Sequence, residues 1–312
     1  MGELAVTSRS FSRNTILRKE VLKIYPDAKF NDDGLSLNGD NLVNFLKGYK
    51  KAITALETID YSILSRLPEL KVIGKYGVGL DMINLEAMDE FNVKLGWTGG
   101  VNKRSVSELV ISFAISLMHR AVFAHAEVKK GEWSQIKGNQ LTGCTFGIVG
   151  CGHIGKDLID LLKPFGCNIL AHDILDFKEF YKKNNVKPAE LEELISKSDV
   201  ISLHLPYDDS TKNIINRNRL GMLKKNAILI NLARGGLIDE KALKETLQKN
   251  KILGAALDVF EVEPPKDMEF AFMDNVIVTP HIGGSTEEAI ISMGMAAING
   301  LENPKSPLIF KK

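Results

Sequence analysis

The sequence has few cysteines and no excess of either charge. Its three cysteines, Cys144, Cys151 and Cys167, are an odd number without a CxxC spacing, which argues against a disulfide framework and against a structural zinc site. We therefore expect reduced thiols and no metal. Lys and Arg total 40 and Asp and Glu total 39, which gives a formal net charge of +1. Nothing in this balance favours nucleic acid or anionic membranes, so an anionic partner must be recognised at a local site.

Long apolar runs and low-complexity tracts are also missing. No segment approaches the roughly 18 consecutive apolar residues that are typical of a membrane span. The stretch MGELAVTSRSFSRN at the start is too polar for a secretory signal. These absences predict a cytoplasmic protein without a membrane partner. The chain has 312 residues, of which 44% are hydrophobic and 25% charged, and this is typical of a globular protein with room for two domains.

Strand-like runs and helical patterns alternate along the chain. In the first hundred residues, LAVTS, KAITA and LKVIGKYGVG are strand-like, and NTILRKEVLKIY and YSILSRLP are helical. Six later runs are apolar almost throughout, as are strands buried on both faces of a parallel sheet: CTFGIVG, CNILAHD, DVISLHL, NAILINLA, ILGAALDVF and NVIVTPH. This alternation predicts an α/β fold with parallel sheets and crossover helices.

Two other segments are predicted as helices. Residues 103–128 are apolar almost all round and carry few charges, which is typical of one helix buried between two layers. This segment is a candidate for a domain-crossing or subunit-packing helix. The segment EEAIISMGMAAINGLENPK predicts one more helix, and Pro304 and Pro307 after it predict a frayed tail.

The sharpest local motif is GCGHIG, residues 150–155, which follows the apolar strand FGIV and opens a helical pattern. Gly150 can make the tight turn, Gly152 lets the backbone approach a pyrophosphate, and Gly155 allows close packing of helix on strand. The helix that follows would offer backbone amides to the anion. The motif is thus interpreted as a dinucleotide-binding turn, although a turn that is only structural could carry the same glycines.

The strand after this motif ends at Asp173, 18 residues beyond Gly155. An acid at this position can bind the adenosine ribose hydroxyls and would repel a 2′-phosphate. The segment HDILDFK has no arginine to receive such a phosphate, so the sequence favours NAD over NADP. Methyltransferases also place glycines and an acid after two strands, and S-adenosylmethionine is therefore an alternative at this point.

Three segments further along decide between these cofactors. They are NLARGGLIDEKAL at 231–243, LDVFEVEP at 257–264 and TPHIGGST at 279–286. Together with GCGHIG they closely resemble the D-isomer-specific 2-hydroxyacid dehydrogenase family, in the branch that includes D-3-phosphoglycerate dehydrogenase. KYGVGLDMIN and GGVNKRSVSELV also look like the substrate loop of that family and the helix after it. The resemblance thus extends over nearly the whole chain.

This resemblance implies a particular architecture. It implies an α/β protein with two Rossmann-like domains and NAD as cofactor. The cofactor domain, residues 101–285, would be inserted into a discontinuous flavodoxin-like substrate domain, residues 1–100 and 286–312, with catalysis between them. A homodimer through the cofactor domain is implied as well. Because the chain ends soon after the last helical pattern, the regulatory domain of long phosphoglycerate dehydrogenases is not expected.

Arg234, Glu263 and His281 are the candidate catalytic residues. The arginine fork can hold a carboxylate at two points, and the usual pKa of histidine, about 6.5, suits proton exchange with the oxygen on carbon 2. Glu263 would pair with the imidazole, orient it and raise its pKa. Each residue alone has a plain structural reading: an ion pair, a solvated acid and a strand-end histidine. Their joint occurrence in family order favours catalysis.

The resemblance also assigns binding residues. Besides Gly150, Gly152, Gly155 and Asp173, the expected cofactor contacts are His153, Ile154, Leu205, Pro206, Thr211, Ala233, Asp258 and Gly283. Asp258 would contact the nicotinamide amide. The expected substrate contacts are Lys75, Tyr76, Gly77, Val78 and Gly79, with Arg234 and His281. His204 and His119 are interpreted as structural.

Lys75 stands where phosphoglycerate dehydrogenases carry an arginine or lysine that faces the distal phosphate. This motivates the hypothesis of a substrate with a second anionic group, such as 3-phosphoglycerate, although a solvated surface lysine is an equal alternative. Glyoxylate, hydroxypyruvate and other 2-oxo acids also fit the catalytic residues. An alternative of another class is a corepressor-like protein that senses NAD. Such proteins usually carry interaction tails, and none is visible here.

Overall fold

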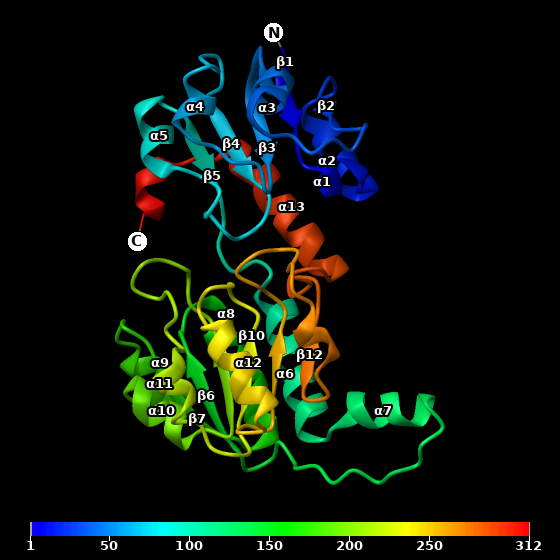
Figure 1. Ribbon diagram of the computed structural model, residues 1–312. Helices are drawn as coiled ribbons and strands as arrows, with labels where there is room; N and C mark the ends of the chain where they lie inside the picture. The colour runs from blue at the N-terminus through cyan, green and yellow to red at the C-terminus, as the bar shows by residue number, and fades with distance from the viewer. Residues whose placement is uncertain (1, 312) are drawn as a thin grey trace. The chain divides into compact units, whose positions relative to one another are not determined.

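The computed structural model describes residues 2–311, which form two compact units (Figure 1). The first unit comprises Met1–Asn102 and Glu287–Lys312, and the second comprises Lys103–Thr286. Each unit is built on its own parallel sheet, so the α/β class predicted from the alternation of apolar runs is confirmed. The functions that the sequence assigns to the two units remain predictions.

The first unit has a five-stranded sheet in the order β2-β1-β3-β4-β5, with every pair parallel. Its strands are β1 (Gly2–Val6), β2 (Lys29–Phe30), β3 (Tyr49–Thr54), β4 (Val72–Lys75) and β5 (Lys94–Gly96). Its helices are α1 (Arg9–Arg13), α2 (Thr15–Ile24), α3 (Gly39–Leu46), α4 (Tyr61–Leu64), α5 (Leu85–Glu90) and α13 (Glu287–Glu302). This strand order is that of flavodoxin-like folds, in which ligands bind beyond the carboxyl ends of the strands.

The end of the chain packs against the first unit, so the expected frayed tail is wrong. Lys305 pairs with Leu95 of edge strand β5 through two backbone hydrogen bonds of 2.9 and 3.0 Å. A short 3-10 helix, η3 (Pro307–Phe310), follows and places the Phe310 ring 5.2 Å from the Trp97 ring, edge to face. Pro304 follows the end of α13 and Pro307 opens η3, but an open strand edge and an aromatic partner hold this segment.

The second unit has a seven-stranded sheet in the order β12-β11-β10-β9-β6-β7-β8, again with every pair parallel. The strands are β6 (Thr145–Val149), β7 (Asn168–His172), β8 (Lys187–Pro188), β9 (Val200–Leu203), β10 (Ile228–Asn231), β11 (Gly254–Leu257) and β12 (Val276–Val278). The six predicted apolar strands are confirmed. β8 was not predicted because it is two exposed residues long. The chain reverses its direction of winding between β6 and β9, where doubly wound sheets bind nucleotides.

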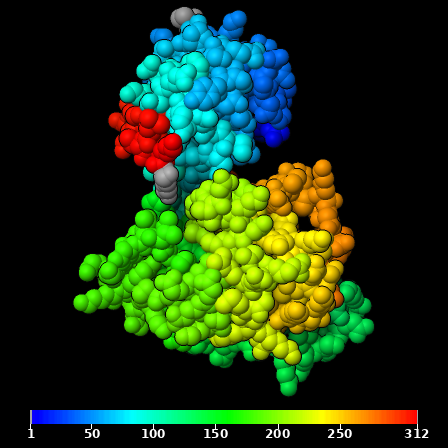
Figure 2. Space-filling model, turned by 60° about the vertical axis from the view of Figure 1, so that its left-hand side comes forward, coloured from blue at the N-terminus to red at the C-terminus, as the bar shows by residue number. Residues whose placement is uncertain are grey.

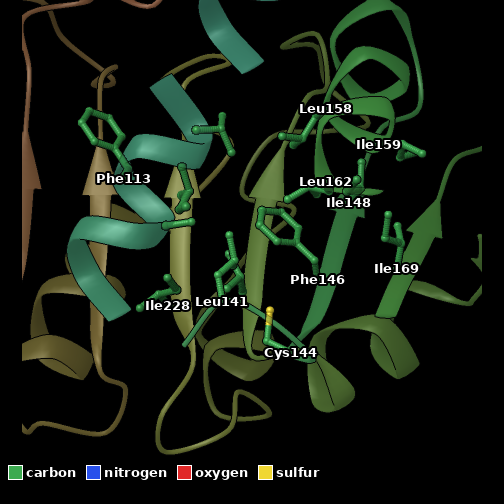
Figure 3. Packing of buried hydrophobic residues seen from close by; sticks show 14 of the residues in the cluster. Phe113, Leu141, Cys144, Phe146, Ile148, Leu158, Ile159, Leu162, Ile169 and Ile228 are labelled. Atoms are coloured by element: carbon green, nitrogen blue, oxygen red, sulfur yellow. The ribbon is translucent and has the colours of Figure 1, made fainter. Parts of the chain in front are cut away.

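Helices cover both faces of this sheet, and the unit forms one continuous body from green to orange in Figure 2. They are α6 (Lys103–Met118), α7 (Ala121–Lys129), α8 (His153–Leu162), α9 (Lys178–Lys183), α10 (Leu191–Lys197), α11 (Arg217–Leu220) and α12 (Glu240–Gln248), with the 3-10 turns η1 (Lys163–Phe165) and η2 (Glu269–Phe272). Side chains alternate between two cores, because successive strand residues point to opposite faces. Ile228 and Ile230 belong to the core that includes α6 and α8 (Figure 3). Leu229 belongs to the core on the opposite face of the sheet, which includes α10 and α12.

The predicted single helix over residues 103–128 is wrong, because the chain bends by 63° between α6 and α7. Arg120, at the bend, has a left-handed backbone with φ of 58°. α6 buries Val110, Ala114 and Leu117 in the core, whereas α7 buries no residue and projects from the unit (Figure 1). Among residues 2–311 no single helix is long and apolar enough to cross a membrane; only this bent pair reaches that length and composition.

Candidate active site

The glycine motif forms a tight turn at the carboxyl end of β6. Gly150 has a φ of 97°, and a Cβ there would lie 2.6 Å from the His204 carbonyl oxygen at the end of β9. A Cβ on Gly155 would lie 2.2 Å from the Gly150 carbonyl oxygen. Side chains at either position would push the turn away from its neighbours. Around Gly152, by contrast, no described atom lies within 4 Å of a built Cβ, which leaves open space above the turn.

The turn leads into the first residues of α8. Gly152 is the N-cap residue, and it gives the helix no side-chain cap. His153 and Ile154, expected to contact the cofactor, form the first turn of this helix. Because the N-cap glycine has no side chain, this helix end leaves room for the pyrophosphate of a dinucleotide.

Asp173 lies at the carboxyl end of β7 and is tied to the glycine turn. Its Oδ2 accepts a 2.6 Å hydrogen bond from the Cys151 amide, and its Oδ1 accepts one of 2.8 Å from the Leu175 amide. The structure thus brings the predicted ribose acid to the predicted pyrophosphate turn. Its contact with the ribose stays a prediction.

Leu205, Pro206 and Thr211 lie in the loop after β9. The methyl Cδ2 of Leu205 is 3.0 Å from a Cβ built on Gly150, so this loop borders the glycine turn. The Thr211 hydroxyl donates to the Pro206 carbonyl at 2.8 Å and accepts from the Asp208 amide at 2.9 Å. Thr211 therefore shapes the loop that presents Leu205 and Pro206.

Arg234 follows β10, at the same carboxyl end of the sheet as the glycine turn. A buried asparagine fixes its backbone. The Asn231 side chain donates to the Arg234 carbonyl at 2.8 Å and accepts from the Ala233 amide at 3.1 Å. The Arg234 Nη1 donates to the Ala233 carbonyl at 2.7 Å. Asn231 was not among the predicted site residues, although a buried amide at the end of an apolar strand was a visible signal.

Glu263 and His281 are brought together. The imidazole Nδ1 and the Glu263 Oε2 are 2.7 Å apart, and Oε1 of the same carboxylate accepts from the Phe260 amide at 3.1 Å. The side chains of His281 and Glu263 are 50% and 37% exposed, so the pair is open to a ligand. This geometry is that of a base oriented by a carboxylate.

Asp258 holds the loop that carries His281. It is 1% exposed, and its Oδ1 accepts from the Thr279 hydroxyl at 2.5 Å and the Ile282 amide at 2.7 Å. Its Oδ2 accepts from the Gly283 amide at 2.8 Å, and its carbonyl accepts from the His281 amide at 2.9 Å. These bonds stabilise His281 in a left-handed backbone conformation with φ of 55°. The expected contact of Asp258 with a nicotinamide amide stays a prediction.

Gly235 is where the turn that carries Arg234 packs against the loop that carries Glu263. A Cβ on this glycine would lie 1.9 Å from the Phe260 carbonyl oxygen and 2.4 Å from the Glu261 amide nitrogen. No side chain fits there without moving the backbone. Sequence reasoning did not single out Gly235, because the need for it comes from a loop 25 residues away.

A cavity of about 450 Å³ lies beside the His281–Glu263 pair. Its walls are mostly apolar and include Phe260, Met268 and Phe270. An apolar ligand group could pack against these walls beside the imidazole.

The predicted substrate residues Lys75 to Gly79 lie in the first unit, at the carboxyl end of β4. Lys75 is only 4% exposed, and its Nζ donates to the carbonyls of Ala55 at 2.5 Å and Tyr76 at 3.3 Å. The alternative of a solvated surface lysine is therefore wrong. Tyr76 is buried, and Gly77 has a φ of 113° that gives the loop its turn. Within residues 2–311, no group of three or more His, Cys, Asp and Glu side chains could hold a metal ion.

The His204 ring is a buried group beside the glycine turn. Both ring nitrogens are buried and have no hydrogen-bond partner among residues 2–311, and burial lowers the pKa of the imidazole from 6.5 to about 3. The folded protein therefore keeps this ring neutral, whereas the unfolded chain takes up a proton below pH 6.5. The contribution of His204 to the free energy of unfolding is thus present above that pH and is lost as the pH falls towards 3.

We expect the free energy of unfolding to fall by about 2 kcal/mol between pH 7 and pH 5 on account of His204. A His204→Leu variant should lose that part of the pH dependence, because its side chain cannot be protonated. Urea unfolding at both pH values measures the difference. Equal pH dependence in the variant and the parent protein would contradict this assignment.

The chain is similar to proteins of one enzyme family. Residues 111–283 match the family model described as "D-isomer specific 2-hydroxyacid dehydrogenase, NAD binding domain". A D-3-phosphoglycerate dehydrogenase of Methanocaldococcus jannaschii is 38% identical over 277 residues, which are 88% of this chain and 53% of the relative. A hydroxypyruvate reductase of Thermotoga maritima is 34% identical over 95% of this chain and 89% of its own length.

Solved structures show the same fold. The D-lactate dehydrogenase of Aquifex aeolicus, complexed with NAD and lactic acid, superposes with a TM-score of 0.84 at 27% identity, over 96% of this chain and 94% of that one. The chain spans about half the length of several phosphoglycerate dehydrogenases that it matches, at 53, 51 and 55% of their residues.

Proposed function

This chain belongs to the D-isomer-specific 2-hydroxyacid dehydrogenase family, and from that premise we propose that it interconverts a small D-2-hydroxy acid and its 2-oxo acid with NAD. The observation that carries the proposal is the 2.7 Å contact of His281 with Glu263. It lies in the same unit as a glycine turn that fits a dinucleotide. The second unit would thus be the cofactor domain and the first the substrate domain.

The residues at the carboxyl edge of the second sheet fit NAD. The turn at Gly150, the first turn of α8 and Asp173 would hold the pyrophosphate and the ribose. Leu205, Pro206, Thr211, Ala233, Asp258 and Gly283 would line the rest of the cofactor site. NAD supplies the acceptor and the donor of the hydride at carbon 2 of the substrate.

His281 is the proposed acid and base of this reaction. Because Glu263 occupies Nδ1 of the ring, Nε2 faces the substrate oxygen: it gives a proton to the carbonyl during reduction and accepts one from the hydroxyl during oxidation. Glu263 stabilises the imidazolium and keeps the ring in one orientation. The Arg234 guanidinium binds the substrate carboxylate, with the backbone of Gly77, Val78 and Gly79 as further donors.

The first experiment follows NADH absorbance with phosphohydroxypyruvate, hydroxypyruvate, glyoxylate, pyruvate and branched 2-oxo acids. Relatives named hydroxypyruvate reductase, glyoxylate reductase and sulfolactate dehydrogenase make several of these plausible. Turnover of any acid, lost in a His281→Asn variant, supports the proposal. Tight NADH binding without turnover of any acid would favour the NAD-sensing role, and binding of S-adenosylmethionine in place of NADH would exclude a dehydrogenase.

Lys75 is the residue that we propose to distinguish a phosphorylated substrate from a smaller one. Its ammonium is buried at the substrate loop, where a second anion would meet a weakly screened charge. Lys75→Met, which keeps most of the side-chain volume, should raise KM for phosphohydroxypyruvate at least tenfold and spare glyoxylate. An exposed lysine in the same unit, Lys71→Met, is the matched control. Equal effects on both substrates would contradict the hypothesis.

We also propose a cytoplasmic homodimer that binds neither nucleic acid nor membranes. Its contact surface would be α7 and the loop after it, where Val122, Val128 and Trp133 are 45, 48 and 84% exposed. Sedimentation should give the mass of a dimer, and Val128→Asp should convert it to a monomer because a buried carboxylate is costly. Ile24→Asp, at an apolar site of the first unit with the same exposure of 48%, should leave the dimer intact. A monomeric parent protein would contradict the proposal.

A further inference from the structure

Two of the three cysteines lie side by side at the amino ends of neighbouring strands. Cys144 precedes β6 and Cys167 precedes β7, and their sulfur atoms are 4.0 Å apart. Figure 3 shows Cys144 at the edge of the core cluster, close to Leu141 and Phe146. This end of the sheet is opposite to the one that carries the glycine turn, so the proposed dehydrogenase site does not use either thiol.

Backbone hydrogen bonds on both sides fix the spacing of this pair. The Gly143 amide donates to the Gly166 carbonyl at 3.2 Å, and the Asn168 amide donates to the Cys144 carbonyl at 2.8 Å. The next residues, Thr145 and Asn168, are ladder partners in the parallel sheet. Cys144 and Cys167 thus stand opposite one another at the usual strand spacing of about 4.8 Å, within the range of Cα separations that a disulfide spans.

The two thiols differ in reactivity. Cys167 is partly exposed and Cys144 is buried. The Cys144 thiol donates to the Cys167 sulfur, which lowers the pKa of Cys167 and raises that of Cys144. Cys167, the more exposed of the two, is therefore the thiol that an oxidant meets first, and Cys144 is placed to attack it afterwards. Cys151 has no part in this pair, and burial raises the pKa of its thiol to about 11.

We propose that Cys144 and Cys167 form a peroxide-reactive dithiol that closes to an intrachain disulfide. In the first step the Cys167 thiolate attacks one oxygen of hydrogen peroxide. An S–O bond forms and the O–O bond breaks, which leaves a sulfenic acid on Cys167. The other oxygen leaves as hydroxide, which takes up one proton to become water. In the second step the Cys144 sulfur attacks the sulfenic sulfur, the S–O bond breaks, and the hydroxide leaves as water with the Cys144 proton. The two sulfurs together lose two electrons, which the peroxide accepts.

The test counts thiols in the intact chain. The reduced protein, treated with hydrogen peroxide, quenched and unfolded, should fall from three titratable thiols to one, and digestion without reductant should yield a peptide that links residues 144 and 167. Dithiothreitol should restore all three thiols. Three thiols after treatment, a link that includes Cys151, or a link between two chains would overturn the proposal.

Three alanine variants sharpen this result. Cys151→Ala should still lose two thiols, whereas Cys167→Ala should keep both of its thiols and form no link. In Cys144→Ala the sulfenic acid cannot be resolved, so a dimedone label should accumulate on Cys167. Labelling of Cys151 in place of Cys167 would also overturn the proposal. If a variant does not fold, the peptide map of the parent protein decides alone.

Discussion

A His281→Asn variant is expected to reduce kcat for every accepted 2-oxo acid by about 10²- to 10⁴-fold, because the acid that we propose to protonate the carbonyl oxygen is lost. Asparagine is a better choice than alanine, since it adopts the left-handed backbone of His281, with φ of 55°, more readily. The loop around Asp258 should therefore keep its shape. Stopped-flow measurement of single turnovers separates this loss from substrate binding.

The control for this variant is NADH binding, for which we propose the glycine turn rather than the imidazole. Its dissociation constant, measured by fluorescence, should change less than about threefold, well below 1 kcal/mol. The kcat of a Glu263→Gln variant should lie between those of the parent protein and His281→Asn. Glutamine still accepts the hydrogen bond through its side-chain oxygen but cannot stabilise an imidazolium. An active His281→Asn enzyme would show that another group transfers the proton.

The strands of the second unit could be predicted from the sequence because strands buried on both faces consist almost entirely of apolar residues. Ile228, Leu229 and Ile230 are apolar in a row since the sheet has a core on each face. The glycine turn could be predicted for a related reason: its residues are adjacent in the chain. Local rules were enough wherever the cause of a conformation lay within a few residues.

The features that could not be predicted depend on distant partners. α7 is as apolar as α6, and only its place in the fold decides that it buries nothing. Lys75 appears as a surface residue until β3 and β4 close around its ammonium. Gly235 is an ordinary residue until the loop at Phe260 packs on it.

Gly235→Ala is expected to disable the site by moving two proposed catalytic residues, Arg234 and Glu263, at once. The added methyl would overlap the Phe260 carbonyl, with 1.9 Å between the two atoms, so the arginine turn and the loop of Glu263 must separate. A displacement of about 1 Å costs on the order of 10²-fold in rate, and both Arg234 and Glu263 are affected. Overpacking should also cost about 1–3 kcal/mol of stability, measurable as a lower urea midpoint.

NADH binding and kcat/KM, measured on the same variant, show whether Gly235→Ala acts through the loops of Arg234 and Glu263. The built Cβ of Gly235 meets Phe260 and Glu261 rather than the turn at Gly150, so the NADH affinity of the folded variant should fall less than its kcat/KM. Gly221→Ala, at an exposed glycine whose built Cβ approaches no atom closer than 3.2 Å, is the matched control and should keep both activity and stability. A Gly235→Ala enzyme with parental kcat/KM would mean that the two loops move independently, and the positions of Arg234 and Glu263 would then have to be set by other contacts.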